Sequence, residues 1–201
     1  RKLSVASDGL KSPCVSILWA GRLIGWKHPD ASIRLAESLK KKGYSFKMTL
    51  IGTGEMEEQL HNMIRDKNLE DCVEMPGAMK ASEVRSYMEK ADIYLFTSDF
   101  NEGWGAVLNE SMNSGCAVVA SHAIGSVPFL IKDGENGVIY ENGNQRDLEK
   151  KVQGLLENTT LRKKIGENAY KTIANIWNAE NAVNRFMKLA DILLRKGKAE
   201  D

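Results

Sequence analysis

The sequence predicts an α/β domain built on a parallel β-sheet and followed by a helical tail. Two observations lead to this prediction: short apolar runs alternate with longer segments of helical periodicity, and the chain is helical throughout from Asp147 to about Lys196. Such alternation is typical of parallel sheets with right-handed crossovers covering both faces. Ligands of these sheets bind outside the carboxyl ends of the strands, which places the functional loops in advance.

Six short apolar runs are the expected strands, and the first of them has the composition of a fully buried strand. The runs are Val15–Ala20, Phe46–Ile51, Cys72–Met75, Asp92–Phe96, Ala117–Ala120 and Gly137–Tyr140. The expected helices between them are Asp30–Lys42, Glu55–Lys67, Ser82–Lys90 and a helix from about Gly105 to Ser114. Pro29 and Gly43 flank the first helix as typical start and stop residues.

The tail is expected to form three helical segments, of which the last has an apolar stripe along one side. The stripe consists of Val183, Phe186, Met187, Ala190, Leu193 and Leu194. We therefore divide the chain into a linker or edge segment (1–14), one α/β domain (15–176) and a C-terminal helix (177–201).

Composition excludes several classes of protein. Lysine and arginine total 28 against 27 acidic residues, so the net charge of +1 gives no reason to expect nucleic acid as a partner. No run approaches the ~20 apolar residues of a membrane span. The chain opens without Met and without the apolar region of a signal peptide, which favours an excised piece of a cytoplasmic protein. The sparse cysteines, Cys14, Cys72 and Cys116, fit a reducing compartment, and the last two are expected to be buried.

The common nucleotide and metal motifs are absent from the sequence. Neither the P-loop pattern nor GxSxG occurs, and Gly52–Gly54 begins a GxGxxG pattern that ends at Glu57 instead of glycine. The histidines His28, His61 and His122 are isolated, and there is no Asp-x-Asp pair. We therefore expect neither a cofactor nor a metal, so any bound diphosphate must be neutralised by protein cations and helix ends.

Two loops have charges that suit a phosphorylated sugar ligand. Arg22 and Lys27 follow the first expected strand, from which both can reach the carboxyl edge of the sheet and bind phosphate oxygens. Glu102 and Glu110 follow the fourth strand, and on a continuous helix they would lie about 12 Å apart and face one groove. The helix N-terminus near Gly105 would add an anion site. Taken singly, each charge has an ordinary alternative as a solvated side chain or a helix-dipole partner.

The segment Glu102–Met112 (EGWGAVLNESM) resembles the E-x7-E segment of the family 4 retaining glycosyltransferases, usually written EGFGLVLLEAMA. Five more segments between about residues 15 and 195 are similar to that family in order and spacing. They are Gly21–Leu23 with Lys27 (GRL…K), Ser114–Ala120 (CGLPVVA), Gly125–Pro128 (GGVPE), Asp133–Gly137 (DGENG) and Ile176–Asn178 (FSWE).

The sequence departs from the family pattern at four places. Trp104 stands in place of the usual Phe, Phe129 in place of the Glu of GGVPE, and Ser126 in place of its second Gly. His28-Pro29 follows Lys27 where the family has Gly. None of these positions is one of the proposed charged residues, but together they leave the identity of the donor open.

The resemblance implies a fold and a role for each matching residue. The chain would be one half of a GT-B enzyme: residues 15–176 form the Rossmann-like donor-binding domain, and residues 177–201 pack toward an N-terminal domain that the chain lacks. Arg22 and Lys27 would hold the donor diphosphate, and Glu102 would contact the transferred sugar; these three are the expected catalytic residues. The expected substrate-binding residues are Gly103, Trp104, Gly105, Val107, Glu110, Gly52, Gly77 and Met79.

The implied function is a metal-independent, retaining transfer of a hexose from a UDP- or GDP-type sugar to a glycan or lipid-linked acceptor in cell-surface polysaccharide synthesis. The acceptor would bind through the missing domain, so this fragment alone is expected to be inactive in transfer. Peripheral association of the full-length enzyme with the inner face of the membrane stays open. Two alternatives remain: a nucleotide-sugar epimerase or phosphorylase of the same GT-B layout, and a non-catalytic Rossmann-like nucleotide-binding module.

Overall fold

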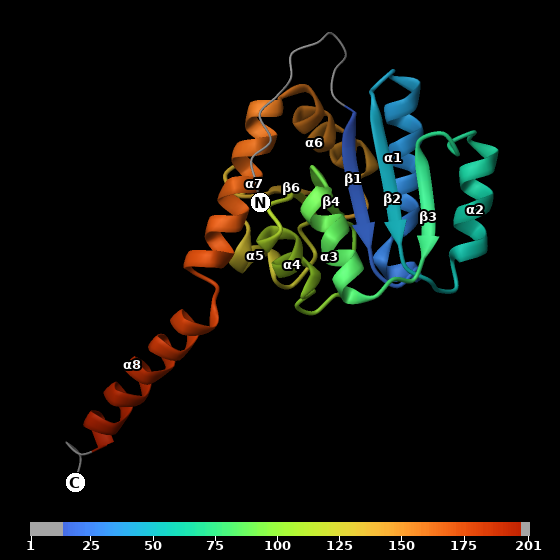
Figure 1. The fold of residues 1–201 in the computed structure, drawn as a ribbon. Helices are drawn as coiled ribbons and strands as arrows, with labels where there is room; N and C mark the ends of the chain where they lie inside the picture. The colour runs from blue at the N-terminus through green and yellow to red at the C-terminus, as the bar shows by residue number, and fades with distance from the viewer. Residues whose placement is uncertain (1–13, 198–201) are drawn as a thin grey trace.

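The centre of the molecule is a parallel sheet of six strands, which the computed structural model shows together with the surrounding helices (Figure 1). The structure describes residues 14–197. The strands are β1 (Val15–Ala20), β2 (Phe46–Ile51), β3 (Val73–Gly77), β4 (Ile93–Phe96), β5 (Ala117–Ser121) and β6 (Val138–Tyr140). Their order is β3-β2-β1-β4-β5-β6, so the chain moves outward from β1 and then returns to its other side. The loops after β1 and β4 therefore diverge at the middle of the sheet, where such folds bind ligands.

Helices cover both faces of the sheet, as the alternation in the sequence predicted. They are α1 (Pro29–Lys41), α2 (Glu57–Asp66), α3 (Ala81–Lys90), α4 (Val107–Asn113), α5 (Val127–Leu130), α6 (Gln145–Glu157), α7 (Thr159–Asn175) and α8 (Ala179–Gly197), with a short 3-10 helix at Gly25–Lys27. Successive residues of a strand point to opposite faces. Ile17 and Trp19 accordingly pack with α1, α2 and α6 in one core, and Leu18 packs with α3, α4 and α7 in the other.

Helix α1 shows how the local sequence determines a helix. Pro29 occupies its first turn, where a missing N–H costs nothing, and Lys40 and Lys41 lie in the last turn, where cations suit the free carbonyl groups. Ile33 and Leu39 are buried on the side that faces the sheet.

The predicted order of elements is confirmed, while most helix ends and several strand ends shift by one or two residues. One shift affects the site: the prediction of a helix from about Gly105 is wrong, because α4 begins at Val107. Gly105 has a φ of +67°, and a Cβ atom there would lie 2.4 Å from the Phe96 ring. Residues 102 to 106 therefore form a loop, so the spacing of Glu102 and Glu110 on a continuous helix does not apply.

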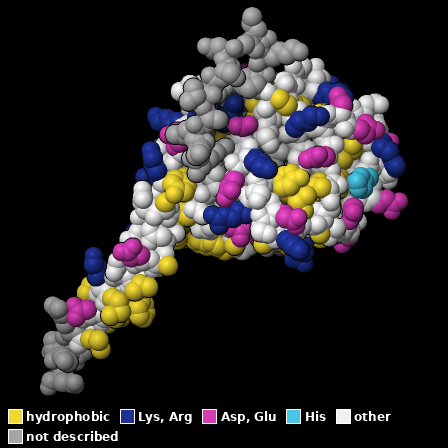
Figure 2. Space-filling view, in the orientation of Figure 1, with side chains coloured by type: hydrophobic (Ala, Val, Ile, Leu, Met, Phe, Trp, Pro, Cys, Tyr) yellow, Lys and Arg dark blue, Asp and Glu magenta, His cyan; other side chains and the backbone are white. Residues whose placement is uncertain are grey.

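Helix α8 projects away from the rest of the molecule (Figure 1). The predicted apolar stripe is exposed to solvent along it, with Phe186 and Leu194 each 68% exposed (Figure 2). The break between α7 and α8 falls at residues 176–178, next to the boundary drawn from the sequence. Most of the segment 1–14 lies outside the described residues. Within residues 14–197, no helix has the length and apolar character needed to cross a membrane.

The cysteines give a test of the core packing. Cys14 is exposed, whereas Cys72 and Cys116 are buried, as predicted. Burial raises the pKa of the Cys72 thiol to about 11. Because the thiolate is the reactive form, we expect Ellman's reagent at neutral pH to modify Cys14 rapidly in the native protein, and all three thiols only after denaturation. Rapid native-state modification of Cys72, located by peptide mass spectrometry, would contradict this packing.

Candidate functional site

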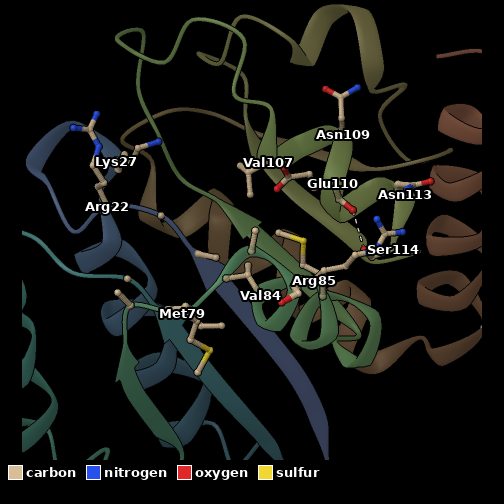
Figure 3. Close-up of a pocket in the computed structure, with 18 of the residues that line it drawn as sticks. Arg22, Lys27, Met79, Val84, Arg85, Val107, Asn109, Glu110, Asn113 and Ser114 are labelled. Carbon is tan, nitrogen blue, oxygen red and sulfur yellow. Dashed lines mark hydrogen bonds between the residues drawn. The ribbon is translucent and has the colours of Figure 1, made fainter. Parts of the chain in front are cut away.

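A cavity of about 790 Å³ opens at the carboxyl edge of the sheet (Figure 3). The loops after β1, β2 and β3 form one part of its wall, and α3, α4 and the C-terminal end of α7 form the other. The loops contribute Gly21, Arg22, Lys27, Gly52, Thr53, Ala78 and Met79; the helices contribute Val84, Arg85, Met88, Val107, Asn109, Glu110, Asn113, Ser114 and Ile173, with Trp177 just beyond α7. This location is the one that the strand order favours for a ligand.

The loop after β1 presents Arg22 on a fixed backbone. Gly21 N–H donates to the Ile51 carbonyl and Leu23 N–H to the Thr53 carbonyl, each at 3.0 Å, and the Leu23 side chain is fully buried. Arg22 itself is exposed. Among the described residues, no carboxylate lies within ion-pair distance of Arg22, so its guanidinium is available to an anionic ligand.

Gly52 is required where the loops after β1 and β2 meet. Its φ is +143°, and a Cβ atom at this position would lie 1.8 Å from the Gly21 carbonyl oxygen. Gly52 N–H also donates to the Gly77 carbonyl at 2.9 Å, which ties in the end of β3. Any side chain at residue 52 would separate the two loops that form this part of the cavity.

Lys27 and Glu102 form an ion pair across the middle of the sheet. Lys27 Nζ donates to Glu102 Oε2 at 2.5 Å, and Ser98 Oγ donates to the same oxygen at 3.0 Å. Both charged side chains are largely buried, with 15% and 12% of their surfaces exposed. Lys27 lines the cavity, and Glu102 lies behind it as its ion-pair partner without lining the cavity itself. Removing either partner would leave the other buried charge uncompensated.

Thr97 also joins these two loops. Its buried hydroxyl accepts a hydrogen bond from Trp19 Nε1 at 2.8 Å and donates to the Lys27 carbonyl at 2.6 Å. Asp99 N–H donates to the Trp26 carbonyl at 3.0 Å. Sequence reasoning missed Thr97, because its position directly after β4 is the only local signal and its role depends on contacts with β1.

Asp99 and His28 add a contact between the same two loops, with His28 Nε2 lying 3.3 Å from Asp99 Oδ2. Partial burial acts to raise the pKa of Asp99, but hydrogen bonds from the backbone and side-chain N–H groups of Asn101 and from His28 outweigh it, and the pKa is lowered. His28 has a φ of +48°, a left-handed conformation that non-glycine residues rarely adopt. The glycine that the family pattern has here would adopt this φ freely, whereas histidine supplies the contact with Asp99.

The cavity brings together six of the eleven residues predicted for the site: Arg22, Lys27, Gly52, Met79, Val107 and Glu110. In Figure 3, Arg22 and Lys27 lie on one side of the cavity and Glu110 lies on the other. Glu102 adjoins the cavity through Lys27. The other four, Gly77, Gly103, Trp104 and Gly105, lie outside the cavity lining.

The sequence did not identify the part of the wall that α3 and the end of α7 supply. Arg85 and Met88 lie on α3, and Trp177 lies far along the chain just beyond α7, so only the folded topology shows that they face one space. Among the residues that the structure describes, no three His, Cys, Asp or Glu side chains gather as metal ligands would.

Comparison with known proteins identifies the family of this chain. A family model described as glycosyl transferases group 1 matches residues 7–172. The chain belongs to this family. The chain is 35% identical over 146 residues to the amylovoran biosynthesis glycosyltransferase AmsK of Erwinia amylovora, covering 70% of this chain and 35% of AmsK. It is 29% identical over 168 residues to a poly(ribitol-phosphate) alpha-N-acetylglucosaminyltransferase of Staphylococcus aureus, covering 84% of this chain and 34% of that protein.

Solved structures of this glycosyl transferase family share the fold. The crystal structure of TarM matches with a TM-score of 0.79 at 27% identity, covering 94% of this chain and 37% of TarM. The C-terminal domain of the group 1 glycosyl transferase LpcC of Francisella tularensis matches with a TM-score of 0.76 at 26% identity, covering 82% of this chain and 87% of that domain. The predicted Rossmann-like parallel α/β fold of GT-B glycosyltransferases is thereby confirmed. The chain spans less than half the length of the curated relatives named above.

The Thr97 contacts generate a stability prediction. Thr97→Val removes the acceptor of the buried Trp19 N–H and should lower the free energy of unfolding by about 1–3 kcal/mol. Thr97→Ser retains the hydroxyl and should stay close to the unaltered protein. Urea unfolding followed by circular dichroism measures both, and equal midpoints for the valine and serine variants would show that the hydroxyl does not join the loops.

Proposed function

We propose that this chain is the donor-binding, C-terminal half of a family 4 retaining glycosyltransferase that works without a metal. The observation that supports this most is the convergence of Arg22, Lys27 and Glu110 on one cavity, with Glu102 held against Lys27. A nucleotide-diphosphate sugar needs cations for its diphosphate and carboxylate oxygens for its hydroxyl groups. The cavity volume of about 790 Å³ lies within the usual range of small-molecule sites.

Charge stabilisation is the main chemical task in this proposal. When the bond between the anomeric carbon and the diphosphate breaks, negative charge develops on the departing phosphate. Arg22 is exposed on a fixed loop beside the Lys27 ammonium, so both cations are in place before the reaction and need little reorganisation. These two residues would therefore hold the diphosphate and lower the barrier to its departure.

The two carboxylates would recognise opposite ends of the donor. Glu110 lies on the first turn of α4 and faces the cavity, where it would accept hydrogen bonds from the ribose hydroxyl groups. Glu102 would contact the transferred sugar. The contacts from Lys27 and Ser98 both use Oε2, which leaves Oε1 as the oxygen for a sugar hydroxyl. The amides of Gly103–Gly105 would line the sugar and phosphates, and the loops at Gly52 and at Gly77–Met79 would face the base.

UDP is the first nucleotide to test. TarM has been crystallised with UDP and alpha-GlcNAc-glycerol, at a TM-score of 0.78 and 26% identity to this chain. This likeness supports a uridine donor over a guanosine donor for the present chain. We propose that the reaction needs no cofactor. A hexose or N-acetylhexosamine would be the transferred group.

The remaining half of the enzyme would bind the acceptor, a glycan or a lipid-linked sugar, and this chain alone would not transfer. The exposed apolar stripe of α8 supports residues 177–201 as the segment that packs toward that half. The LpcC structure, a C-terminal domain on its own, supports independent folding of residues 15–176. We place the enzyme in the cytoplasm, at the inner face of the membrane where cell-surface polysaccharides begin.

Nucleotide binding tests the site directly on this chain. We expect isothermal titration calorimetry to show that UDP binds. Arg22→Ala should raise the Kd for UDP by about 10- to 100-fold, since a charged hydrogen bond contributes roughly 1.5–3 kcal/mol. Arg65→Ala, the same change of charge on α2 outside the cavity, should leave Kd unchanged. GDP and ADP serve as comparison ligands. Absence of nucleotide binding, or equal Kd values for the two variants, would contradict the proposal.

Turnover tests the assigned chemistry in the longer protein that contains this chain. There Arg22→Ala should lower kcat by about 10²–10³-fold, the usual effect of removing one preorganised charge-stabilising group. Incubation with the donor alone should yield no epimerised sugar, and addition of inorganic phosphate should yield no sugar phosphate. Near-normal turnover of the variant would refute the role of Arg22, and either product would favour the epimerase or phosphorylase alternative.

A further inference from the structure

Three aromatic side chains from distant parts of the chain pack together beside the site. Trp104 of the loop before α4 stacks on Phe129 of α5 with ring centres 5.9 Å apart. Trp177 packs on the same Trp104 ring with ring centres 5.7 Å apart. We call this trio, Trp104, Phe129 and Trp177, the aromatic clamp. Phe129 is 64% exposed, Trp104 43% and Trp177 39%, so the clamp is not part of the hydrophobic core.

Trp104 belongs to the loop that contains Glu102. Gly105 on its other side is held against Phe96 in a left-handed conformation, and the Glu102 carbonyl accepts a hydrogen bond from Gly125 N–H at 3.3 Å. The indole N–H of Trp104 donates to Asn109 Oδ1 at 2.9 Å, and Asn109 lines the cavity. The position of the Trp104 ring therefore affects both the backbone next to Glu102 and the wall of the cavity.

The partners of Trp104 lie on structure that is itself fixed. Trp177 follows α7, and its N–H donates to the Thr172 carbonyl at 3.1 Å, while Asn178 Nδ2 donates to the Ala174 carbonyl at 2.7 Å. Phe129 lies on α5, where its neighbours Val127 and Leu130 are buried. Trp104 therefore packs against two rings whose backbones are fixed.

The clamp also explains two departures from the family pattern together. Trp104 replaces the usual Phe, and Phe129 replaces the usual Glu. The structure shows that these two residues are in contact with each other. A glutamate at residue 129 would remove the ring that stacks on Trp104, so the two replacements act as a pair.

We infer that Phe129 and Trp177 are positioning residues, which hold the Glu102–Gly105 loop in the conformation that receives the sugar of the donor. The inference rests on the proposed function, because it assigns this loop to the sugar. Phe129 lies outside the cavity lining and contacts the loop through Trp104, whereas Trp177 also lines the cavity. Loss of the Phe129 ring should therefore weaken recognition of the sugar and leave recognition of the nucleotide intact.

The test compares the affinities of UDP and UDP-N-acetylglucosamine for this chain by calorimetry, with UDP-glucose as a second sugar donor. In Phe129→Ala, the Kd for UDP should stay within about 2-fold, while the Kd for the sugar donors should rise by about 3- to 10-fold, as expected for the loss of one aromatic pair. Phe129→Tyr keeps the ring and should restore the affinity. Trp104→Phe, which has the usual family residue, should also retain most of it.

Controls separate positioning from general destabilisation. Tyr170→Ala removes a half-exposed aromatic ring on α7 outside the clamp and should change neither affinity. Because Trp177 also lines the cavity, Trp177→Ala should weaken both ligands, the sugar donors more than UDP, and Trp177→Phe should reduce both losses. The inference alone would be overturned if the ratio of the UDP and sugar-donor Kd values stayed unchanged in Phe129→Ala and Trp177→Ala. This outcome includes an equal weakening of both ligands. Failure of the unaltered chain to bind UDP would overturn the proposed function and this inference with it.

Discussion

The contact between Lys27 and Glu102 is the interaction on which the site depends. It joins the loops that leave β1 and β4, the two central strands from which the chain diverges to opposite halves of the sheet. Without contacts between them, the loops after β1 and β4 would be free to separate. The ion pair and the Thr97 hydrogen bonds both hold these loops together, and Lys27 contributes to the cavity wall.

This arrangement also divides the work between the two cations. Lys27 is compensated by Glu102, whereas Arg22 is exposed on a loop whose backbone is held by hydrogen bonds. An arriving anion therefore meets Arg22 as an uncompensated charge, and it shares Lys27 with a carboxylate already in place. Because Glu102 takes up part of the Lys27 charge, the proposed recognition of the sugar and of the diphosphate would be electrostatically linked.

Much of the fold and half of the site could be predicted from the sequence, because both follow from local patterns. Buried strands are apolar runs, and a parallel sheet brings the loops after them to one edge, which was enough to place Arg22, Lys27 and Gly52. The predicted start of α4 was wrong because the true start depends on the approach of Gly105 to Phe96, a contact made only in the folded chain. Thr97 and Trp177 were missed for a related reason, since each acts through partners more than sixty residues away in sequence.

The geometry of α8 has a mechanical consequence. Its 19 residues make a rod about 28 Å long at 1.5 Å per residue. The rod meets the body at residues 176–178, where Trp177 packs on Trp104. A tilt of ~10° at this pivot would displace the far end by about 5 Å, close to the pitch of one helical turn. A displacement of the distant end is thus transmitted, with reduced amplitude, to the Trp104 ring, which lies two residues from Glu102.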